Sequence, residues 1–440
     1  MIFADSIVAL SSGRLPAGVA VIRISGPQSR FVVETIASPF PAERTAAYRK
    51  LTGNDGETLD RALVIFFAGP NSFTGEDVAE FQVHGGPAVV SAILTRIAVL
   101  PGVRMAEPGE FTRRAFLNGK MDLAQTEALA DLVNAETEAQ RRFALRNAEG
   151  VQGALYTSWR TRLIHARAMI EADIDFADED DVPGSVANSV WLDVSGLIEE
   201  ISEHLRGFSA AEIIQDGYEV VILGAPNAGK SSLFNALAQR EAAIVSDEPG
   251  TTRDVLEIVL DVGGLKIRIA DTAGLREDAG KVEMIGIERA RARSRQANLV
   301  LVLEDLSDPR PIETGVLSVP ILRIGTKLDI NADSARALQY DLCISTLLGE
   351  SLAELMTEIR ARAEARVGSA GQVLPSRLRH VELLEGALRH LRSAVAPELE
   401  ELELRAEELR LAADQLGRIV GSVDVEDLLD VIFSQFCIGK

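Results

Sequence analysis

Short apolar runs alternate with Gly- and Pro-rich turns along the first 118 residues. The runs lie at 19–25 (VAVIRIS), 62–67 (ALVIFF) and 77–83 (DVAEFQV), among turn motifs such as GPNSFTG and HGGP. Apolar, β-branched runs of this length, bounded by such turns, are typical of strands. The pattern predicts a mixed α+β domain over residues 1–118.

A helical pattern follows from Leu123 to about Phe208, where apolar residues recur at spacings of three and four. The acidic stretch IDFADEDDVPG interrupts it. A second helical pattern begins after residue 375, with leucines on one stripe and a break at Pro397. We therefore predict one all-α domain that is built from two segments, 119–213 and 369–440.

Between these segments the pattern changes at Tyr218 to a buried strand, YEVVILG, and strands then alternate with helices to about Arg366. A parallel sheet with crossover helices requires this alternation. We predict an inserted α/β domain over 214–368, so that the fold class is multidomain α+β and α/β.

The composition describes an acidic globular protein. Its 440 residues are 47% hydrophobic and 25% charged, and 66 acidic against 45 basic residues give a net charge of -21. This composition excludes collagen-like and largely disordered chains. A surface of this charge repels phosphate backbones and anionic membranes, so a local patch or a partner would have to hold a nucleic acid.

Cysteine usage and the first residues favour a cytoplasmic location. Cys343 and Cys437 lie far apart and form no CxxC motif, which argues against a disulfide framework or a zinc site. No apolar run reaches the roughly 18 residues of a membrane-spanning helix. The N-terminus, MIFADSIVAL, carries an acid where a signal peptide carries bases.

A phosphate-binding loop stands between the strand at 218–223 and an amphipathic helix. Residues 224–231 read GAPNAGKS and fit GxxxxGK[ST]. Backbone amides can converge on the β-phosphate, Lys230 can reach the β and γ oxygens, and Ser231 can ligate magnesium. The predicted phosphate-binding residues are Asn227, Ala228, Gly229, Lys230, Ser231 and Ser232.

Two later strand ends favour GTP over ATP. The strand LKIRIA delivers Asp271, Thr272, Ala273 and Gly274, in which the acid holds the magnesium shell and the Gly274 amide can donate to the γ-phosphate. The strand VPILRIG delivers Thr326, Lys327, Leu328 and Asp329. The Asp329 carboxylate can accept both guanine N–H donors, a pair that adenine does not offer, while the Lys327 stem covers the ring.

Ser345 and Thr346 follow a further apolar strand end, where a GTPase places its last base-contacting loop. The set resembles the signature of translation-factor-like GTPases. Those enzymes commonly have Asn at the position of Thr326 and Ala at that of Thr346.

Hydrolysis needs a polar group other than the usual glutamine, because Leu275 follows Gly274. Candidate groups that could orient or deprotonate water are Glu277, Asp278 and Glu283. Positive charge could come from Arg253, Arg276, a partner or a bound cation. Asn227 and the carbonyls of residues 246–252 could build an oxygen cage for a monovalent ion.

Seven segments, some of which contain the motifs above, are spread along the chain. They are GPNSFTGEDVAEFQVHGGP, PGEFTRRAFLNGKMDLAQTEALADL, PNAGKSSLFNAL, EAAIVSDEPGTTRD, DTAGLRE with VEMIGIERA, and the terminal FCIGK. In this order they resemble the MnmE (TrmE) family of tRNA-modification GTPases over nearly the whole sequence.

The resemblance implies an N-terminal folate-binding domain that also dimerises the chain, a helical domain and an inserted Ras-like G domain. It implies that, with the flavoprotein MnmG, the protein adds an aminomethyl or carboxymethylaminomethyl group to carbon 5 of the wobble uridine of certain tRNAs. The added carbon would come from methylene-tetrahydrofolate. Potassium-dependent dimerisation of the G domains would activate GTP hydrolysis.

The implied cofactors are K+, Mg2+ and a tetrahydrofolate derivative in the 5,10-methylene or 5-formyl form, with GTP as substrate. The implied partners are a second copy of the chain, tRNA, and MnmG in a heterotetramer or larger complex. No membrane partner is expected.

The resemblance also assigns roles in the G domain. Asn227 would hold potassium with backbone oxygens of Ser246, Glu248 and Thr251, and Ser231 and Thr252 would hold magnesium. Glu283 would orient the attacking water, beside Lys230 and the switch arginines Arg253 and Arg276. The nucleotide-binding switch loop would comprise Ser246, Asp247, Glu248, Pro249, Gly250, Thr251 and Thr252.

The folate residues implied by the resemblance are Arg23, Glu80, Lys120 and Lys440, and Cys437 would be a functional thiol. Glu80 alternates with Gln82 and His84 on the polar face of its strand, where a carboxylate can accept the paired N–H donors of a pterin edge.

Two other functions remain open. The chain could be a regulatory GTPase switch or assembly factor, whose N-terminal domain only mediates dimerisation and docking. It could also be a P-loop ATPase, which competition by GTP but not by ATP would exclude.

Overall fold

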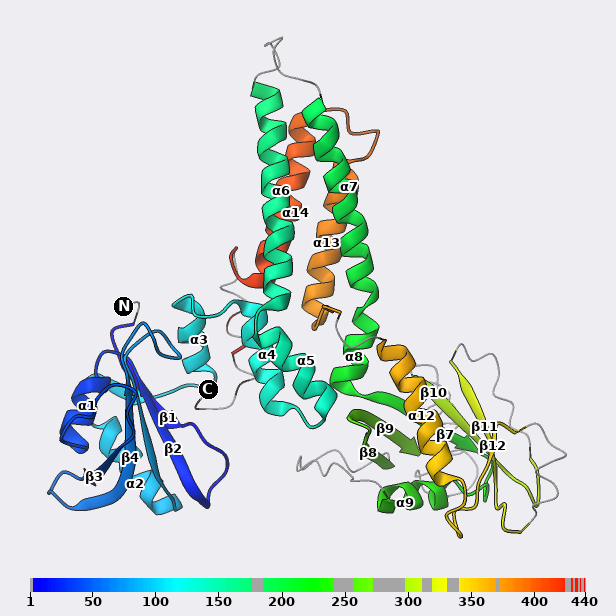
Figure 1. Cartoon of the computed structure of the whole chain (residues 1–440), viewed down its shortest axis with the longest axis horizontal. Helices are drawn as coiled ribbons and strands as arrows, with labels where there is room; N and C mark the ends of the chain where they lie inside the picture. Colours follow the sequence, from blue (N-terminus) through cyan, green and yellow to red (C-terminus); the bar gives the residue numbers. More distant parts are fainter. Residues whose placement is uncertain are drawn as a thin grey trace, which may run out of the picture. The chain divides into compact units, whose positions relative to one another are not determined.

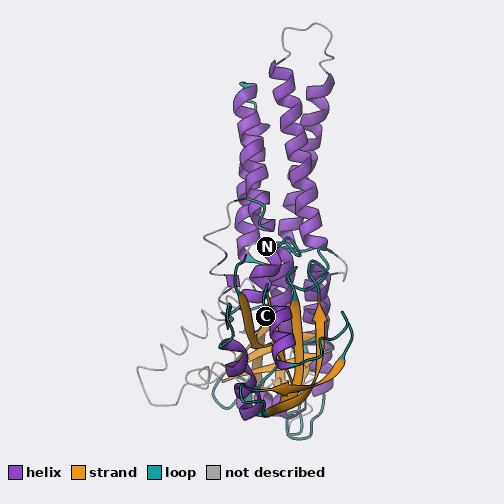
Figure 2. Ribbon diagram, turned by 90° about the vertical axis from the view of Figure 1, so that its left-hand side faces the viewer, coloured by secondary structure: helices purple, strands orange, loops and turns teal. Residues whose placement is uncertain are grey.

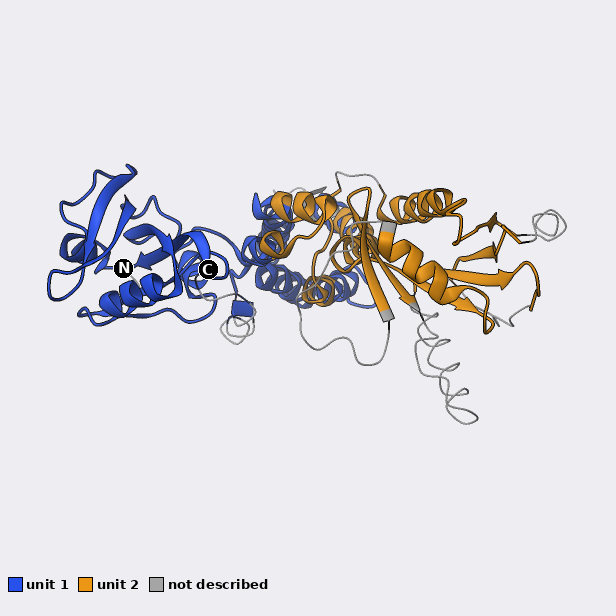
Figure 3. Cartoon of the chain, turned by 90° about the horizontal axis from the view of Figure 1, so that it is seen from below, with its two compact units in different colours: residues 1–130, 147–195, 385–440 blue, residues 131–146, 196–384 orange. Residues whose placement is uncertain are grey.

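The chain forms two compact units, shown in different colours in Figure 3. One comprises Met1–Ala130, Asn147–Ser195 and Glu385–Lys440, and the other comprises Asp131–Arg146 and Gly196–Leu384. The computed structural model describes residues 3–175, 185–240, 256–271, 297–310, 319–330, 340–368, 372–423, 429, 432, 433, 436 and 439. The predicted domain boundaries at 118, 213 and 368 stay predictions.

A six-stranded sheet organises the beginning of the first unit (Figure 1). Its strand order is β3-β4-β5-β2-β1-β6, and all neighbours are antiparallel except β1 and β6. The strands are β1 (Ser6–Leu10), β2 (Ala17–Ser25), β3 (Ala47–Thr52), β4 (Thr58–Phe67), β5 (Val78–Gly85) and β6 (Val103–Met105). The strands predicted at 19–25, 62–67 and 77–83 are confirmed as β2, β4 and β5.

The two faces of this sheet differ. Helices α1 (Ser29–Ile36) and α2 (Pro87–Ala98) pack with the apolar side chains of one face, where Ile22, Phe66 and Phe81 are fully buried. Alternate residues point to the other face because side chains alternate along a strand. There Glu80 and Gln82 are half-buried and His84 is exposed, which confirms the predicted polar face of β5.

Long helices form the rest of the first unit. They are α6 (Val151–Asp175), α14 (Leu402–Val420) and the parts of α7 (Ser185–Arg206) and α13 (Leu378–Ala394) that belong to this unit. Helices α6 and α14 run side by side (Figure 1), and the long helices of the chain are the tall purple ribbons of Figure 2. The Arg405 guanidinium of α14 lies 5.1 Å from the ring centroid of Trp191 on α7. In the described residues the helical patterns from Leu123 to about Phe208 and after residue 375 are confirmed, as is the break at Pro397 between α13 and α14.

Shorter helices complete the first unit and begin the second. They are α3 (Glu110–Leu117), α4 (Leu123–Asn134) and α5 (Glu138–Ala148). In the described part of the chain, no helix is both long and apolar enough to cross a bilayer.

The second unit contains the predicted α/β sheet, in the strand order β12-β11-β10-β7-β9-β8. The strands are β7 (Tyr218–Gly224), β8 (Leu256–Val262), β9 (Leu265–Asp271), β10 (Leu299–Asp305), β11 (Ile321–Thr326) and β12 (Leu342–Cys343). Helices α8 (Phe208–Asp216), α9 (Lys230–Arg240) and α12 (Leu352–Val367) accompany them. Val220, Ile267 and Leu301 are fully buried in its core.

One strand departs from the parallel arrangement that alternation predicts. β8 pairs antiparallel with β9, and Val262 lies opposite Leu265. The two-residue connection is Gly263–Gly264, with φ values of +63° and +87°. Two consecutive positive φ values are what a tight hairpin turn requires, and glycine adopts them without strain. A hairpin therefore replaces a crossover helix here.

Two histidines are buried where α7 ends and α13 begins. His204 is 8% exposed and His380 is fully buried. The pKa of His204 is lowered to about 4, chiefly by burial and also by the nearby His380, while a hydrogen bond with the Val373 backbone opposes the shift. His204 is therefore neutral in the folded protein at physiological pH.

We expect this histidine to make the second unit acid-sensitive. Its pKa is about 4 when folded, against an ordinary value of 6.5 for an exposed histidine, so the unfolded chain binds more protons between these values. The contribution of neutral, buried His204 to the free energy of unfolding is fully present above pH 6.5 and is lost as pH falls toward 4. At pH 5 the loss is about 2 kcal/mol. Urea unfolding at pH 7.5 and 5 should show a smaller pH effect in His204→Gln, whereas exposed His165→Gln should behave as wild type. If the free energy of unfolding of His204→Gln changed with pH as much as that of the wild type, His204 would not be the source of the acid sensitivity.

Candidate functional site

The parallel strands of the second unit bring four predicted segments to one edge of the sheet. Strand β7 pairs in parallel with β9 and β10, and β11 pairs in parallel with β10 and β12. The carboxyl ends of parallel strands meet at the same edge, where open α/β sheets bind ligands. The segments that follow these ends include the loop at 224–229, Asp271, the loop at 326–329 and Ser345.

The phosphate-binding loop closes around its own lysine. Asn227 and Gly229 both have positive φ, +66° and +87°, and α9 begins at Lys230. The Lys230 ammonium donates to the carbonyls of Gly224 at 2.9 Å and Ala225 at 3.0 Å. The cation thus lies across the loop, and phosphate oxygens could replace these carbonyls as acceptors. Ser231 and Ser232 are exposed in the first turn of α9.

Thr326 ties the loop at 326–329 to the phosphate-binding loop. Its side chain is buried, and its hydroxyl lies 2.9 Å from the carbonyl of Ala228 and 3.2 Å from that of Glu304. One hydroxyl proton can serve either carbonyl. The threonine that stands at the position of the common asparagine therefore still joins the two loops.

The two charged residues of this loop have separate partners. The Lys327 ammonium pairs with the Asp305 carboxylate at the end of β10, at 2.5 Å. Exposed Asp329 accepts a hydrogen bond from the Ser345 hydroxyl at 2.6 Å. The Leu328 amide donates to the carbonyl of Ile344 at 3.1 Å, which fixes the two loops side by side. Thr346 directly follows Ser345 and is half-buried.

Several predicted site residues lie outside the described part of the chain. For Asp271 the structure describes the backbone at the end of β9. The predicted residues outside the description are Ser246, Asp247, Glu248, Pro249, Gly250, Thr251, Thr252, Arg253, Thr272, Ala273, Gly274, Arg276, Glu283, Cys437 and Lys440. The same holds for Leu275, Glu277 and Asp278.

A second candidate site lies on the polar face of the first sheet. Arg23 of β2 is directly opposite Glu80 of β5, and both Nε and Nη2 of the arginine contact Oε1 of the glutamate, at 2.9 and 2.8 Å. The guanidinium also lies 5.3 Å from the ring centroid of Phe73 and 5.8 Å from that of Phe111. Half-buried Phe73 and the partly exposed ion pair can offer stacking and directional hydrogen bonds to a ligand, whereas Phe111 is fully buried beneath them.

Lys120 reaches the loop that carries Phe73. Its ammonium donates to the carbonyl of Pro70 at 3.0 Å. It also lines a pocket of about 830 Å³ with Phe116, Leu117, Met121 and Ser422. The loop at 70–73 therefore connects Lys120 with the Arg23–Glu80 pair.

Described residues around the C-terminal motif pack on the same unit. Phe433 lies 6.5 Å from Phe116 and 5.8 Å from Phe436, measured between ring centroids. A Cβ on Gly439 would stand 2.0 Å from the carbonyl oxygen of Leu10 at the end of β1. Only a glycine permits this close approach of the tail to the sheet.

A buried charge cluster supports this unit, and the sequence pattern does not reveal it. Arg114 is fully buried, and its Nη1 lies 3.3 Å from both carboxylate oxygens of Glu76. Its Nη2 contacts Asp5 at 2.9 Å and Glu110 at 3.1 Å. Ser25 donates to Glu76 at 2.7 Å. The arginine therefore joins α3, the N-terminal segment and the loop before β5.

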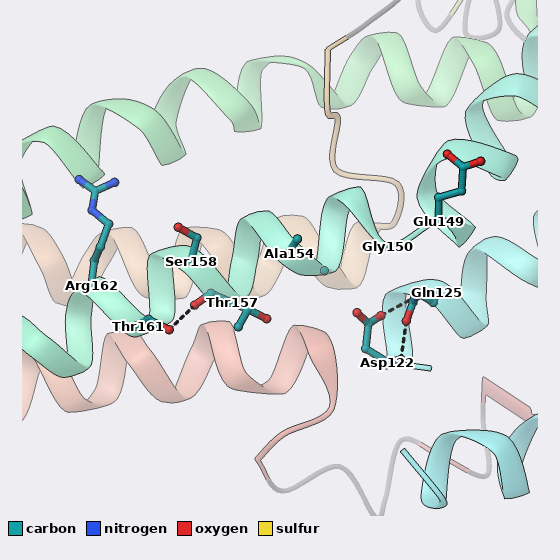
Figure 4. Close-up of a pocket in the computed structure, with 10 residues that line it drawn as sticks. Asp122, Gln125, Glu149, Gly150, Ala154, Thr157, Ser158, Thr161 and Arg162 are labelled. Carbon is teal, nitrogen blue, oxygen red and sulfur yellow. Dashed lines mark hydrogen bonds between the residues drawn. The ribbon is translucent and has the colours of Figure 1, made fainter. Parts of the chain in front are cut away.

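A polar groove lies along α6 (Figure 4). It measures about 710 Å³, and its lining includes Asp122, Gln125, Thr157 and Arg162. Two of the dashed lines join the Asp122 amide to the Gln125 side chain, and the Gln125 amide to the Asp122 carboxylate, at 2.9 and 2.7 Å. This reciprocal pair caps α4. None of the predicted site residues lines this groove.

Comparison with known proteins gives the following likenesses. The family model described as GTP-binding protein TrmE N-terminus matches residues 6–120, and the model described as MnmE helical domain matches residues 123–437. The tRNA modification GTPase MnmE of Mesorhizobium japonicum is 68% identical over 443 residues and covers 100% of both chains. That of Brucella anthropi is 56% identical over 436 residues, covering 99% of this chain and 98% of its own.

A solved structure resembles part of the chain. The G domain of the T. maritima FeoB iron transporter is 26% identical and covers 33% of this chain and 99% of its own, with a TM-score of 0.27.

We expect the buried arginine cluster to be required for stability of the first unit. Glu76→Ala should lower the free energy of unfolding by about 3 kcal/mol, because it removes a buried counter-charge of Arg114. Replacing both charges, in Glu76→Leu with Arg114→Met, should restore much of this loss. Urea unfolding followed by circular dichroism measures both, with exposed Glu57→Ala as control. A single variant as stable as the control would show that Glu76 does not hold Arg114.

Proposed function

The chain belongs to the MnmE family of tRNA modification GTPases, and from this premise we propose how it acts. It hydrolyses GTP in the second unit and, with the flavoprotein MnmG, adds an aminomethyl or carboxymethylaminomethyl group to carbon 5 of the wobble uridine of certain tRNAs. The added carbon comes from a methylene-tetrahydrofolate. The observation that carries the proposal is the match to the MnmE relatives over the full length of the chain. Each of the two units also has a polar candidate site.

The proposed nucleotide site uses the edge of the second sheet. Lys230 and the amides around it receive the phosphates, Ser231 and Thr252 hold Mg2+, and Asp329 receives the guanine. Support comes from the Lys230 ammonium at the mouth of the loop and from the exposed Asp329 carboxylate, whose two oxygens can accept further hydrogen bonds beside the one from Ser345. Glu283 orients the attacking water, and Arg253 and Arg276 act in the switches.

A monovalent cation belongs to the same proposal. The Asn227 side chain is exposed at the tip of the loop, and an amide oxygen there fits a K+ ligand. Backbone oxygens of Ser246, Glu248 and Thr251 complete the proposed cage. When bound there, the ion would supply the positive charge that an arginine finger supplies elsewhere, and the proposal links this site to dimerisation of the G domains.

The proposed folate site uses the polar face of the first sheet. Glu80 accepts the paired donors of the pterin edge, while Arg23, Lys120 and Lys440 hold its carbonyl or anionic groups. The partial exposure of the Arg23–Glu80 pair, 21% and 19%, supports this role because a ligand can reach it. Cys437 is the proposed thiol of the terminal motif.

The proposed assembly is a homodimer that binds MnmG in a heterotetramer or larger complex in the cytoplasm. Val19, Tyr48 and Leu63 are 60%, 61% and 40% exposed on the first sheet, and Tyr48 lies opposite Leu63. A second copy could cover these apolar side chains. The net charge of -21 favours MnmG as the main holder of tRNA.

The alternative function is a regulatory GTPase switch whose first unit only dimerises and docks. The Arg23–Glu80 pair is also compatible with a purely structural ion pair. Folate affinity separates the two functions.

We expect Glu80→Ala to abolish binding of 5-formyltetrahydrofolate, because the pterin donors lose their acceptor. Isothermal titration calorimetry of the full-length protein measures binding, and tRNA modification with MnmG measures the consequence. Asp55→Ala, in the exposed connection between β3 and β4, is the matched acid control. If the wild-type protein itself does not bind the folate, the switch function is favoured instead.

We expect potassium to stimulate GTP hydrolysis strongly over sodium at equal ionic strength, since the two ions differ mainly in radius. Asn227→Ala should lose this stimulation while keeping its affinity for GDP. Phosphate release in the two salts measures the rates. Equal rates in wild type would leave a GTPase and remove the cation-dependent mechanism.

A further inference from the structure

The loop at 326–329 carries two opposite charges that could pair with each other and so block the guanine site. It carries a cation, Lys327, two positions from Asp329, the carboxylate proposed to receive guanine. Opposite charges a few ångströms apart attract strongly near a protein surface. A lysine side chain is long enough to fold back onto Asp329 and occupy the acceptors that the base requires.

Each charge has a different partner in the structure. Lys327 turns to Asp305 on the neighbouring strand, and Asp329 turns to Ser345 on the other side of the loop. The backbone of Lys327 has a φ of +60°, which is uncommon for a residue with a side chain. The side chain of Asp305 is only 12% exposed, against 35% for Lys327, so the acid is the more enclosed member of this pair.

Asp305 is itself held firmly. Its Oδ1 accepts from the amide of Ser307 at 2.8 Å and from the Ser307 hydroxyl at 2.5 Å, which leaves Oδ2 for Lys327. Its carbonyl accepts from the amide of Asp308 at 3.1 Å. Burial alone would raise the pKa of Asp305, but the hydrogen bonds from Lys327 and Ser307 lower it. The carboxylate is therefore a fixed, charged acceptor at neutral pH.

We propose that Asp305 is a positioning residue for guanine recognition, which holds the Lys327 ammonium away from Asp329 and fixes the lysine stem as one wall of the base site. This inference rests on the proposed guanine site at 326–329. Asp305 acts through Lys327 and makes no contact with the base. A stem fixed before binding loses less rotamer freedom when the nucleotide enters.

Asp305→Asn in the full-length protein tests the proposal with the fluorescent probe mant-GDP. The amide has no charge to retain the ammonium, so the dissociation constant should rise about tenfold, mainly through faster dissociation. Single-turnover hydrolysis at saturating GTP should stay as in wild type. Asp308→Asn is the matched control, because its carboxylate is 61% exposed and pairs with Arg310. An affinity within about twofold of the control would overturn the proposal.

A double-variant cycle separates positioning from a general structural effect. Lys327→Met keeps an apolar stem and removes the charge that Asp305 is proposed to restrain. On that background Asp305→Asn should cause no further loss of mant-GDP affinity. A loss as large as in the wild-type background would overturn the proposal, because Asp305 would then act independently of Lys327. Asp305→Glu, which keeps the charge, should restore part of the affinity.

The base site has its own test. Asp329→Asn replaces one of the two carboxylate acceptors with an N–H donor that opposes a guanine N–H, and must weaken GDP binding. Unchanged GDP affinity in that variant would refute the guanine site, and with it the proposal. Loss of affinity in Asp329→Asn but not in Asp305→Asn would retain the site and refute only the role of Asp305.

Discussion

The parallel pairing of β7 with β9 and β10 is the constraint on which the nucleotide site depends. Register places Gly224 beside Leu303 and Ile222 beside Asp271, so the loops that follow these strands begin at one level. The hydroxyl of Thr326, at the end of β11, then joins the loop at 326–329 to the loop at 224–229 through a buried contact with Ala228. The positions of both loops follow from the strands before them. The geometry of the site is thus a consequence of sheet register and of one buried hydroxyl.

In both units, charged side chains are held in place by ion pairs or hydrogen bonds with residues of other helices, strands or loops. In the first unit, Arg114 joins α3 to Glu76 in the loop before β5, and that loop leads to the strand that carries Glu80. In the second unit, Asp305 and Ser345 separate the charges of Lys327 and Asp329. A buried or enclosed ion pair adds little stability over an apolar pair, but it fixes orientation because each partner is costly to leave alone. Both sites use this property.

The sequence predicts what is local and misses what is paired at a distance. The phosphate-binding loop is readable because its glycines, lysine and serine occur within eight residues, and β2 and β5 are readable from their apolar runs. The pairing of Arg23 with Glu80 is not readable, because strand register depends on the whole sheet. The ion pairs of Asp305 and Arg114 cannot be predicted for the same reason, since their partners Lys327 and Glu76 are 22 and 38 positions away in the sequence. The β8–β9 hairpin differs from the crossover that alternation predicts, although Gly263–Gly264 is a turn signal.

That hairpin shows how a single turn can connect a sheet with a helix outside it. The carbonyl of Gly264 accepts from the Ala139 amide of α5 at 2.9 Å, and Lys266 pairs with Glu136 at 2.7 Å. These two contacts hold the turn of the hairpin on residues just before and within α5. The other end of β9 pairs with β7 as far as Asp271. A shift of β9 along β7 would break the backbone bond and the ion pair together. The register that positions Asp271 is therefore supported from both ends of the same strand.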